Sequence, residues 1–317
     1  NFCGHVHMGC FKRAKASTDL TYWPLALKNG AVIETGARVR RVTTNSSGIA
    51  TGADYVDSKG VERHQPARSV VMAANGIGTP RLLLLSKSDS HPNGLANSSG
   101  LVGKNLMFHP FAMITGVFPE NMKTWQGPLS NFAMSQEFYE TDKSRGFDRG
   151  YTYQFQRSLG PGWVANGGFT SPIPWGEGHH EELEKRLGSM MAIAVIGEDL
   201  PELHNTVDLD PDLTDSDGIP APRINYTMSK NSRDQLDHGI KNATKVFETA
   251  GASDIYVDPL MRQSGWHLMG TARMGEDISN SVVDQWGQAH DVDNLFIIDG
   301  SVFVTGAAVN PTPTIQA

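Results

Sequence analysis

Short apolar or β-branched runs, separated by turn residues, recur along most of this chain. Runs of this kind, bounded by Gly, Pro, Asn and Asp, are typical of β-strands. The pattern predicts strands over 31–34, 38–44, 52–57, 61–64, 69–74, 112–118, 151–156, 190–196, 206–209 and 295–298. Because the strands between 107 and 263 are short and joined by turns, we expect them to form an antiparallel sheet.

Apolar residues at helical spacing interrupt this pattern most clearly over 229–250. Ser229 is placed to cap the start of that helix, and Gly251 is placed to end it. Its apolar face consists of Leu236, Ile240, Ala243 and Phe247. Shorter helices are predicted over 180–187 and 81–85.

The predicted strand 69–74 leads through a Gly-rich turn into helix 81–85, with Pro80 in its first turn. Proline is favoured at the start of a helix, where its missing N–H would have no partner anyway. A strand, a Gly-rich turn and a helix N-terminus together favour phosphate binding. The following segment, 87–105, is rich in Ser, Asn, Gly and Pro and predicts a loop.

Composition narrows the class of protein. The chain has 317 residues, 39% of them hydrophobic, which is enough for two packed domains of ordinary size. Its net charge of −7 and the absence of a basic block argue against a nucleic-acid partner. The apolar runs, such as 190–196, are far too short to predict a transmembrane segment.

The two cysteines, Cys3 and Cys10, flank His5 and His7 within eight residues. This spacing is too tight for a structural zinc site, whose ligand pairs are separated by a longer insert, so no metal site is predicted. Two cysteines also make no disulfide scaffold. The chain begins with Asn1 rather than Met, so we expect it to begin inside a longer protein, and its compartment, periplasmic or cytoplasmic, stays open.

An Asp-rich run over 208–218 looks at first like a calcium-binding loop. Counted from Asp208, however, the sixth position is Leu213 where such a loop needs Gly, and the twelfth is Ile219 where it needs Glu. We interpret this run as a solvated turn.

The stretch from 264 to 317 carries the strongest candidate chemistry. His267 stands among glycines and can transfer a proton near neutral pH, and Asn310 can orient a polar substrate. Asp299 follows the apolar strand 295–298, at the strand end where open α/β sheets usually bind ligands. The alternative is a buried structural histidine followed by ordinary turns.

Three ordered motifs within this stretch resemble the C-terminal signature of the glucose–methanol–choline (GMC) family of FAD-dependent oxidoreductases. They are HxxGTxRMG at 267–275, NLFIIDGSVF at 294–303 and VNPTPTIQA at 309–317. Gly-Trp-His at 265–267 and Asp-Gly-Ser-Val-Phe-Val-Thr at 299–305 look closest to the sugar and sugar-acid dehydrogenases of the family.

Further matches occur upstream in the family's order. Segment 9–26 is similar to Gly-Cys-x-x-Gly-Ala-Lys-x-Ser and a following Thr-Tyr-x-Pro-x-Ala helix, with Arg13 in place of the usual Gly. Segment 76–80 matches Gly, Thr and Pro of the second signature, and 102–110 resembles VGxNLxxHP. Within that last motif, we interpret His109 as structural rather than catalytic.

The resemblance implies oxidation of a CH–OH group of an alcohol, sugar or sugar acid, with FAD taking the hydride. It makes His267 the general base and Asn310 the second catalytic residue, which orients the substrate oxygen. It also implies that Asp299 and Gly300 face the ribityl and pyrophosphate groups of FAD. Quinone, a cytochrome and oxygen all remain open as electron acceptors.

For the two ends of FAD, the resemblance points to other parts of the chain. The backbone of Val39, in the family's GARV strand, would contact the adenine, and the backbones of Pro311 and Thr312 would pass near the flavin ring.

The implied fold is α/β, mixed with α+β: part of a Rossmann-like FAD-binding domain (1–106 and 264–317) and a substrate-binding domain (107–263) with an antiparallel sheet and flanking helices. The phosphate-binding GxGxxG of the family is absent from these residues. We therefore expect a C-terminal fragment of such an enzyme. The alternative is a non-catalytic fragment or binding module that does not hold FAD by itself.

Overall fold

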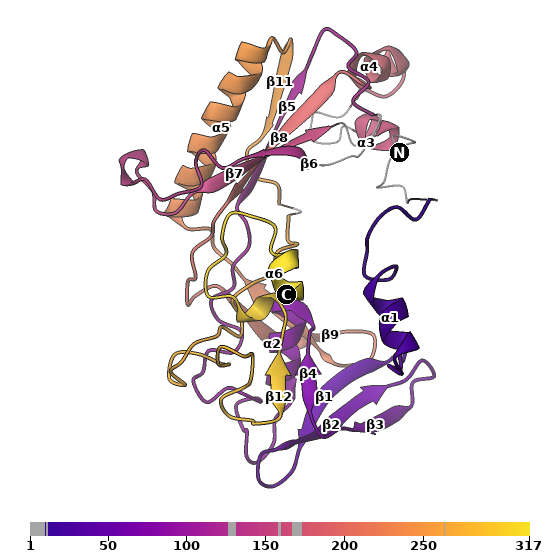
Figure 1. The fold of residues 1–317 in the computed structure, drawn as a ribbon, viewed down its shortest axis with the longest axis vertical. Helices are drawn as coiled ribbons and strands as arrows, with labels where there is room; N and C mark the ends of the chain where they lie inside the picture. Colours follow the sequence, from indigo (N-terminus) through magenta and orange to yellow (C-terminus); the bar gives the residue numbers. More distant parts are fainter. Residues whose placement is uncertain (1–9, 11, 126–130, 158–159, 167–172, 263) are drawn as a thin grey trace. The chain divides into compact units, whose positions relative to one another are not determined.

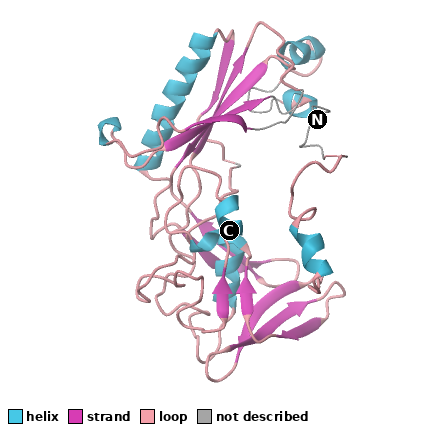
Figure 2. Ribbon diagram, viewed as in Figure 1, coloured by secondary structure: helices cyan, strands magenta, loops and turns pink. Residues whose placement is uncertain are grey.

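The computed structural model describes residues 10, 12–125, 131–157, 160–166, 173–262 and 264–317. The chain forms two compact units, each built from three separate segments. The large-sheet unit consists of Asn1–Ile33, Pro110–Glu198 and Lys230–Ser264, and the His267 unit consists of Glu34–His109, Asp199–Ser229 and Gly265–Ala317. Figure 2 shows one sheet with a long helix in the first, and several smaller groups of strands joined by loops in the second.

The large-sheet unit is built on a five-stranded antiparallel sheet in the order β11-β5-β8-β7-β6. Its strands are β5 (Phe111–Val117), β6 (Asn131–Ser135), β7 (Tyr151–Arg157), β8 (Met190–Gly197) and β11 (Asp254–Asp258). Its helices are α1 (Tyr22–Lys28), η2 (Lys143–Arg145), α3 (Pro161–Ala165), α4 (His179–Arg186) and α5 (Lys230–Ala250). The antiparallel sheet predicted for this part of the chain is confirmed.

Helix α5 runs along one face of this sheet (Figure 1). Leu236, Ala243 and Phe247 are buried, as the helical spacing predicts, and Ile240 is half-buried. The helix ends where Gly251 takes φ +84°, a left-handed conformation that favours glycine. A Cβ on Gly116 would lie 2.6 Å from the Phe247 ring, so β5 carries glycine where the helix packs closest.

The His267 unit contains three small sheets. A three-stranded antiparallel sheet has the order β1-β2-β3, β9 and β10 form an antiparallel hairpin, and β4 pairs with β12 in parallel. Its strands are β1 (Arg38–Thr44), β2 (Ala50–Val56), β3 (Glu62–Pro66), β4 (Val70–Met72), β9 (Thr206–Thr214), β10 (Pro220–Asn225) and β12 (Leu295–Ile297). Its helices are α2 (Asn75–Leu85), η3 (Gly300–Val302) and α6 (Thr312–Gln316).

Strands β4 and β12 join parts of the chain that lie far apart in the sequence. Their register pairs Leu295 with Val70 and Ile297 with Met72. Leu295, Ile297 and Met72 are buried in a common core, whereas Val71 is 56% exposed. The predicted strand over 69–74 is therefore confirmed but shorter, and one of its faces is open rather than buried.

Four other predictions about local structure need correction. Residues 31–34 form no strand, and helix α2 begins at Asn75, well before 81. The predicted strands 52–57 and 61–64 are confirmed and pair as the antiparallel hairpin of β2 and β3, but the Asp-rich run is a turn only at its end, because β9 continues to Thr214. Strand β9 also belongs to a separate hairpin, not to the large sheet.

The two compact units divide the chain differently from the predicted boundaries of 1–106 with 264–317 and 107–263. The described residues before Glu34 group with the large sheet, and 199–229 group with the His267 unit. The β9–β10 hairpin belongs there because Arg81 of α2 donates from Nη2 to Asp215 Oδ2 (2.8 Å) and from Nε to the Pro220 carbonyl (2.8 Å). Which unit binds a flavin and which a substrate stays a prediction.

Candidate active site

His267 lies on a segment that runs antiparallel to the loop before β5. Met107 and Met269 exchange both backbone hydrogen bonds, at 3.0 and 3.1 Å, and form an antiparallel bridge. Side chains of a paired segment alternate between faces with a period of two residues. His109 and His267, each two residues from the bridge, therefore oppose each other on the same face. Their rings meet edge to face, with centroids 4.8 Å apart and an interplanar angle of 83°.

Glycine at position 270 allows the two segments to come this close. Gly270 has φ +91°, and a Cβ there would lie 2.1 Å from the carbonyl oxygen of Asn105. No side chain fits so near a backbone atom without moving it. The glycines around His267 thus make room for the chain's own backbone.

The electrostatic environment of His267 favours the neutral imidazole. Burial, and secondarily the Coulomb effect of His109, lower the pKa of His267 from 6.5 to about 4. Its Nδ1 atom is buried and has no hydrogen-bond partner among the described residues. A histidine that stays unprotonated at neutral pH can accept a proton from a bound hydroxyl.

The backbone of Leu268 packs between the start of α2 and the start of η3. A Cβ on Gly76 and a Cβ on Gly300 would each lie 2.6 Å from the Leu268 carbonyl oxygen. Two glycines from distant motifs therefore allow the segment that carries His267 to pack closely against both helix starts. Gly300, predicted to face FAD, is buried and makes this contact.

Helix α2 contains Pro80, which cannot donate to the carbonyl of Gly76, four residues earlier. The hydroxyl of Thr271 donates to that carbonyl instead, at 2.8 Å. Thr271 and Gly76 both belong to predicted family motifs, so this bond fixes one motif to the other. It also explains how the helix continues through the proline.

Asp299 is almost completely buried and accepts three hydrogen bonds. Its Oδ2 accepts from the Thr79 hydroxyl (2.5 Å) and the Asn75 backbone N–H (3.1 Å), and its Oδ1 accepts from the Ser301 N–H (2.8 Å). The carboxylate thus sits at the start of α2 and also caps η3. The helix N-terminus that favours an anion holds this carboxylate.

Val39 lines an apolar cavity of about 390 Å³ beside β4 and α2. The cavity extends along Val71, Ala74 and Gly78, so it reaches the start of the helix that Asp299 caps. Val39 itself is 40% exposed. The structure therefore connects Val39 to the surroundings of Asp299 through one continuous lining.

A second cavity, of about 530 Å³, borders Asp299 on the side of the C-terminal segment. Its lining is largely apolar and includes Trp286, Ile298, Phe303 and Ile315. Of the remaining predicted residues, Asn310 is exposed, Pro311 is buried, and Thr312 is exposed as the first residue of α6. These three lie in the same compact unit as His267.

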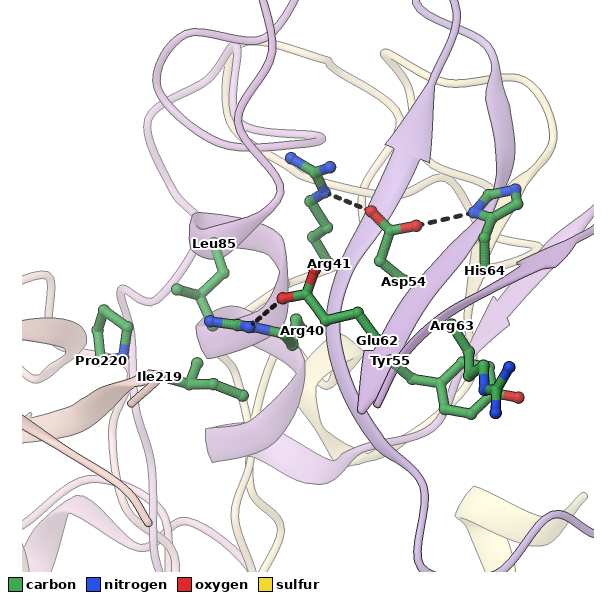
Figure 3. Close-up of a pocket in the computed structure, with 10 residues that line it drawn as sticks. All are labelled: Arg40, Arg41, Asp54, Tyr55, Glu62, Arg63, His64, Leu85, Ile219 and Pro220. Carbon is green, nitrogen blue, oxygen red and sulfur yellow. Dashed lines mark hydrogen bonds and ion pairs between the residues drawn. The ribbon is translucent and has the colours of Figure 1, made fainter. Parts of the chain in front are cut away.

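A third cavity, of about 550 Å³, is lined mainly by charged side chains of β1, β2 and β3 (Figure 3). The charges are paired: Arg41 Nε lies 2.7 Å and His64 Nδ1 lies 2.8 Å from the Asp54 carboxylate, and Arg40 Nη1 lies 2.5 Å from Glu62. None of the predicted site residues lines this cavity. Its mutually neutralising pairs give it no evident role in the predicted chemistry.

Sequence reasoning did not find the partners that hold the site together. Thr79, Thr271 and Asn75 appeared only as parts of motifs, and His109 was not expected next to His267. The pairing of Met107 with Met269 produces that contact, and neither segment shows it in its own sequence.

Among the described residues, no cluster of three or more side chains has the geometry to hold a metal ion. Cys3, His5 and His7 lie outside the described residues. Within the described part of the chain, no helix combines the length and the apolarity needed to cross a membrane.

Fold and site together describe a mixed α/β protein with a helix start, a strand-end carboxylate and a half-buried histidine in one unit. The chain belongs to the GMC oxidoreductase family, whose N-terminal and C-terminal sequence profiles match residues 1–111 and 201–317. The resemblance predicted from the motifs is thereby confirmed.

Two curated relatives and one solved structure illustrate the family. The chain is 43% identical over 301 residues to 2-methyl-1,2-propanediol dehydrogenase of Mycolicibacterium austroafricanum, covering 94% of this chain and 54% of the relative. It is 30% identical over 296 residues to the fructose dehydrogenase large subunit of Gluconobacter japonicus, covering 92% and 53%. Formate oxidase of Aspergillus oryzae RIB40 has a similar fold (TM-score 0.61, 18% identity, 88% and 57% covered). The chain thus spans about half the length of the curated relatives it matches.

Proposed function

We propose that this chain forms the catalytic part of an FAD-dependent oxidoreductase that oxidises a CH–OH group of an alcohol or a sugar. One observation carries the proposal: His267, which the family motif marks as the general base, is held with its pKa lowered to about 4. It is therefore ready to accept a proton at neutral pH. The curated relatives, a diol dehydrogenase and a fructose dehydrogenase, support this substrate class.

The residues present fit a dinucleotide such as FAD. The cavity beside Val39 is lined by aliphatic side chains, which suit the flat, apolar face of an adenine ring. The cavity beside Asp299 is also largely apolar and lies next to the C-terminal segment. Val39 would hold the adenine, Asp299 and Gly300 the ribityl and pyrophosphate region, and Pro311 and Thr312 the flavin ring.

When bound, FAD supplies the acceptor for a hydride from the substrate carbon. The chain's own residues handle the other half of the reaction. His267 takes the hydroxyl proton at the same carbon, and Asn310 donates a hydrogen bond that orients the substrate oxygen. The apolar residues beside Val39 and Asp299 would pack against the cofactor. A quinone or cytochrome partner, or oxygen, would take up the two electrons that the substrate gives.

The general-base role of His267 is tested with the His267→Ala variant. The FAD-loaded variant is mixed with a 1,2-diol or a ketose in the absence of oxygen. General-base catalysis contributes typically about 10²- to 10⁴-fold, so we expect flavin bleaching to slow by that factor at unchanged flavin content. The matched control is His204→Ala, because His204 is an exposed histidine of the same unit. Unchanged bleaching in His267→Ala would remove the assignment.

The alternative is a binding module that does not hold FAD on its own, and a different measurement decides it. The purified chain is titrated with FAD while its absorption spectrum and flavin fluorescence are followed. We expect a saturable change that the bulky substitution Gly78→Trp, in the cavity lining, weakens. A chain that folds but gives no change up to millimolar FAD would favour the alternative.

A further inference from the structure

We propose that His109 is a positioning residue of the active site, whose buried ring holds the imidazole of His267 in one orientation and keeps a second proton away from it. The proposal rests on the proposed role of His267 and deepens it. Sequence reasoning interpreted His109 as structural, and the geometry of the paired segments gives it this more specific task.

The backbone fixes where His109 points. The bridge between Met107 and Met269 sets the register, so His109 and His267 face each other by construction. Pro110 follows directly, and a residue before proline is restricted to extended conformations. His109 therefore continues the paired segment rather than turning away from it.

The fit between the two rings is tight. The His109 side chain is only 2% exposed, and the edge-to-face arrangement is the one that aromatic rings prefer. An imidazole confined on one side by another ring has fewer rotamers to sample. Orientation matters here, because a displacement of about 1 Å in a reacting group can cost about 10²-fold in rate.

The loop that carries His109 is itself clamped. The Phe108 N–H donates to Asp199 Oδ2 at 3.3 Å, and the Tyr226 hydroxyl donates to the same oxygen at 2.7 Å. The Phe108 ring also meets the Tyr226 ring edge to face, with centroids 4.9 Å apart. Asp199 is 1% exposed, so this anchor is buried and hydrogen-bonded on the loop next to His109.

Two neighbouring histidines also repel each other when both are protonated. Besides the two histidines, Asp199 and Tyr226 are titratable groups that contact this loop. Burial is the first cause of the lowered pKa of His267, and His109 is the second. Replacing the His109 imidazole removes this second cause, so the pKa of His267 should rise only part of the way from about 4 to 6.5.

Two variants separate orientation from charge. His109→Phe keeps a flat ring against His267 but cannot take a proton, whereas His109→Ala removes both properties. His204→Ala again serves as the control. Each FAD-loaded variant is assayed for flavin content, for kcat and for the pH dependence of kcat/KM, and the His267 ring is titrated by NMR with ¹⁵N-labelled histidine.

We expect His109→Phe to keep kcat within about threefold and to move both the acidic limb of kcat/KM and the NMR titration of His267 to higher pH. His109→Ala should show the same shift and lose about 10- to 100-fold in kcat. If the role of His109 is purely structural, both variants should lose flavin content or stability, and the acidic limb of kcat/KM should stay at the same pH. An unmoved His267 titration together with unchanged kcat in His109→Ala would overturn the proposal.

The NMR titration also separates the two levels of inference. If His267→Ala keeps full turnover, the general base is wrong. A shift of the His267 titration in His109→Phe would still establish the coupled pair. If His267→Ala is inactive and His109→Phe leaves the His267 titration unchanged, His267 keeps its role as general base and the positioning role of His109 is wrong.

Discussion

The two compact units of this chain are held together in different ways. In the large-sheet unit, β5 and β8 pair along seven residues, and the 21-residue α5 buries an apolar face. In the His267 unit, the strands are divided among three small sheets, and side chains tie the backbone together. Asn294 is an example: its amide donates to the carbonyls of Ala50 and Arg68 at 2.8 Å each and accepts from the Ala50 N–H at 3.0 Å.

This difference shows where chemistry can be placed. In a regular β-ladder, the backbone N–H and C=O groups are hydrogen-bonded to each other and need no side-chain partners. A loop-rich unit depends on polar side chains at fixed points, and those points can hold a functional residue in place. His267, Asp299 and Gly300 all lie in the unit of the second kind. The comparison predicts that single substitutions act through packing in one unit and through hydrogen bonds in the other.

The largest effect is expected from Phe247→Ala in the large-sheet unit. Removing this buried ring next to Gly116 leaves a cavity, and such substitutions cost about 3–5 kcal/mol of unfolding free energy. Denaturant unfolding measures the loss. Val246→Ala, at the exposed neighbouring position, is the control and should cost well under 1 kcal/mol. Similar losses in both variants would mean that α5 is not held by its apolar face.

A smaller loss is expected from Asp299→Asn in the His267 unit. Asparagine keeps the shape of the side chain, but its NH₂ group replaces one of the two carboxylate oxygens. An NH₂ group cannot accept a hydrogen bond, so the N–H or O–H donors on that side lose their acceptor. Losing a hydrogen bond to a charged group costs about 1.5–3 kcal/mol. Flavin content should fall together with stability, measured by absorbance and by thermal unfolding. Asp291→Asn, whose carboxylate binds exposed Ser98, is the control, and equal effects in the two would contradict a special role for Asp299.

The smallest effect is expected from Thr271→Val. Valine keeps the shape but leaves the Gly76 carbonyl without its donor, which should cost about 1–2 kcal/mol. Thr249→Val on the exposed end of α5 removes a hydroxyl bond of the same length, 2.8 Å, where water can replace it. A loss of stability in urea unfolding for the Thr271 variant alone would support the difference between the two units. No difference between the two would mean that the helix does not need this substitute for the bond missing at Pro80.

Local pattern predicted most of the large-sheet unit. Strands β5, β7 and β8 follow from their apolar or β-branched runs, and helix α5 follows from apolar residues at helical spacing, because these residues are the ones that the fold buries. The start of α2 was missed, because Pro80 looked like a first-turn residue. The carbonyl it leaves unpaired is satisfied by Thr271, which no local pattern can reveal. Segment 31–34 has strand-like composition but no pairing partner among the described residues.

The candidate site was predictable as a set of residues but not as an arrangement. Family motifs named His267, Asp299 and Gly300, and the structure places them around the Leu268 backbone. The ring of His109 against His267 depends on a backbone bridge between two distant segments. Such tertiary pairing is set by register, and register is not written in either strand alone.

The bridge between Met107 and Met269 also fixes the number of residues that must separate it from each histidine. Each histidine stands two residues from its methionine, and side chains alternate at every step. One residue inserted or deleted between Phe108 and His109, or between His267 and Leu268, would turn that histidine to the opposite face. The length of these two intervals should therefore be fixed.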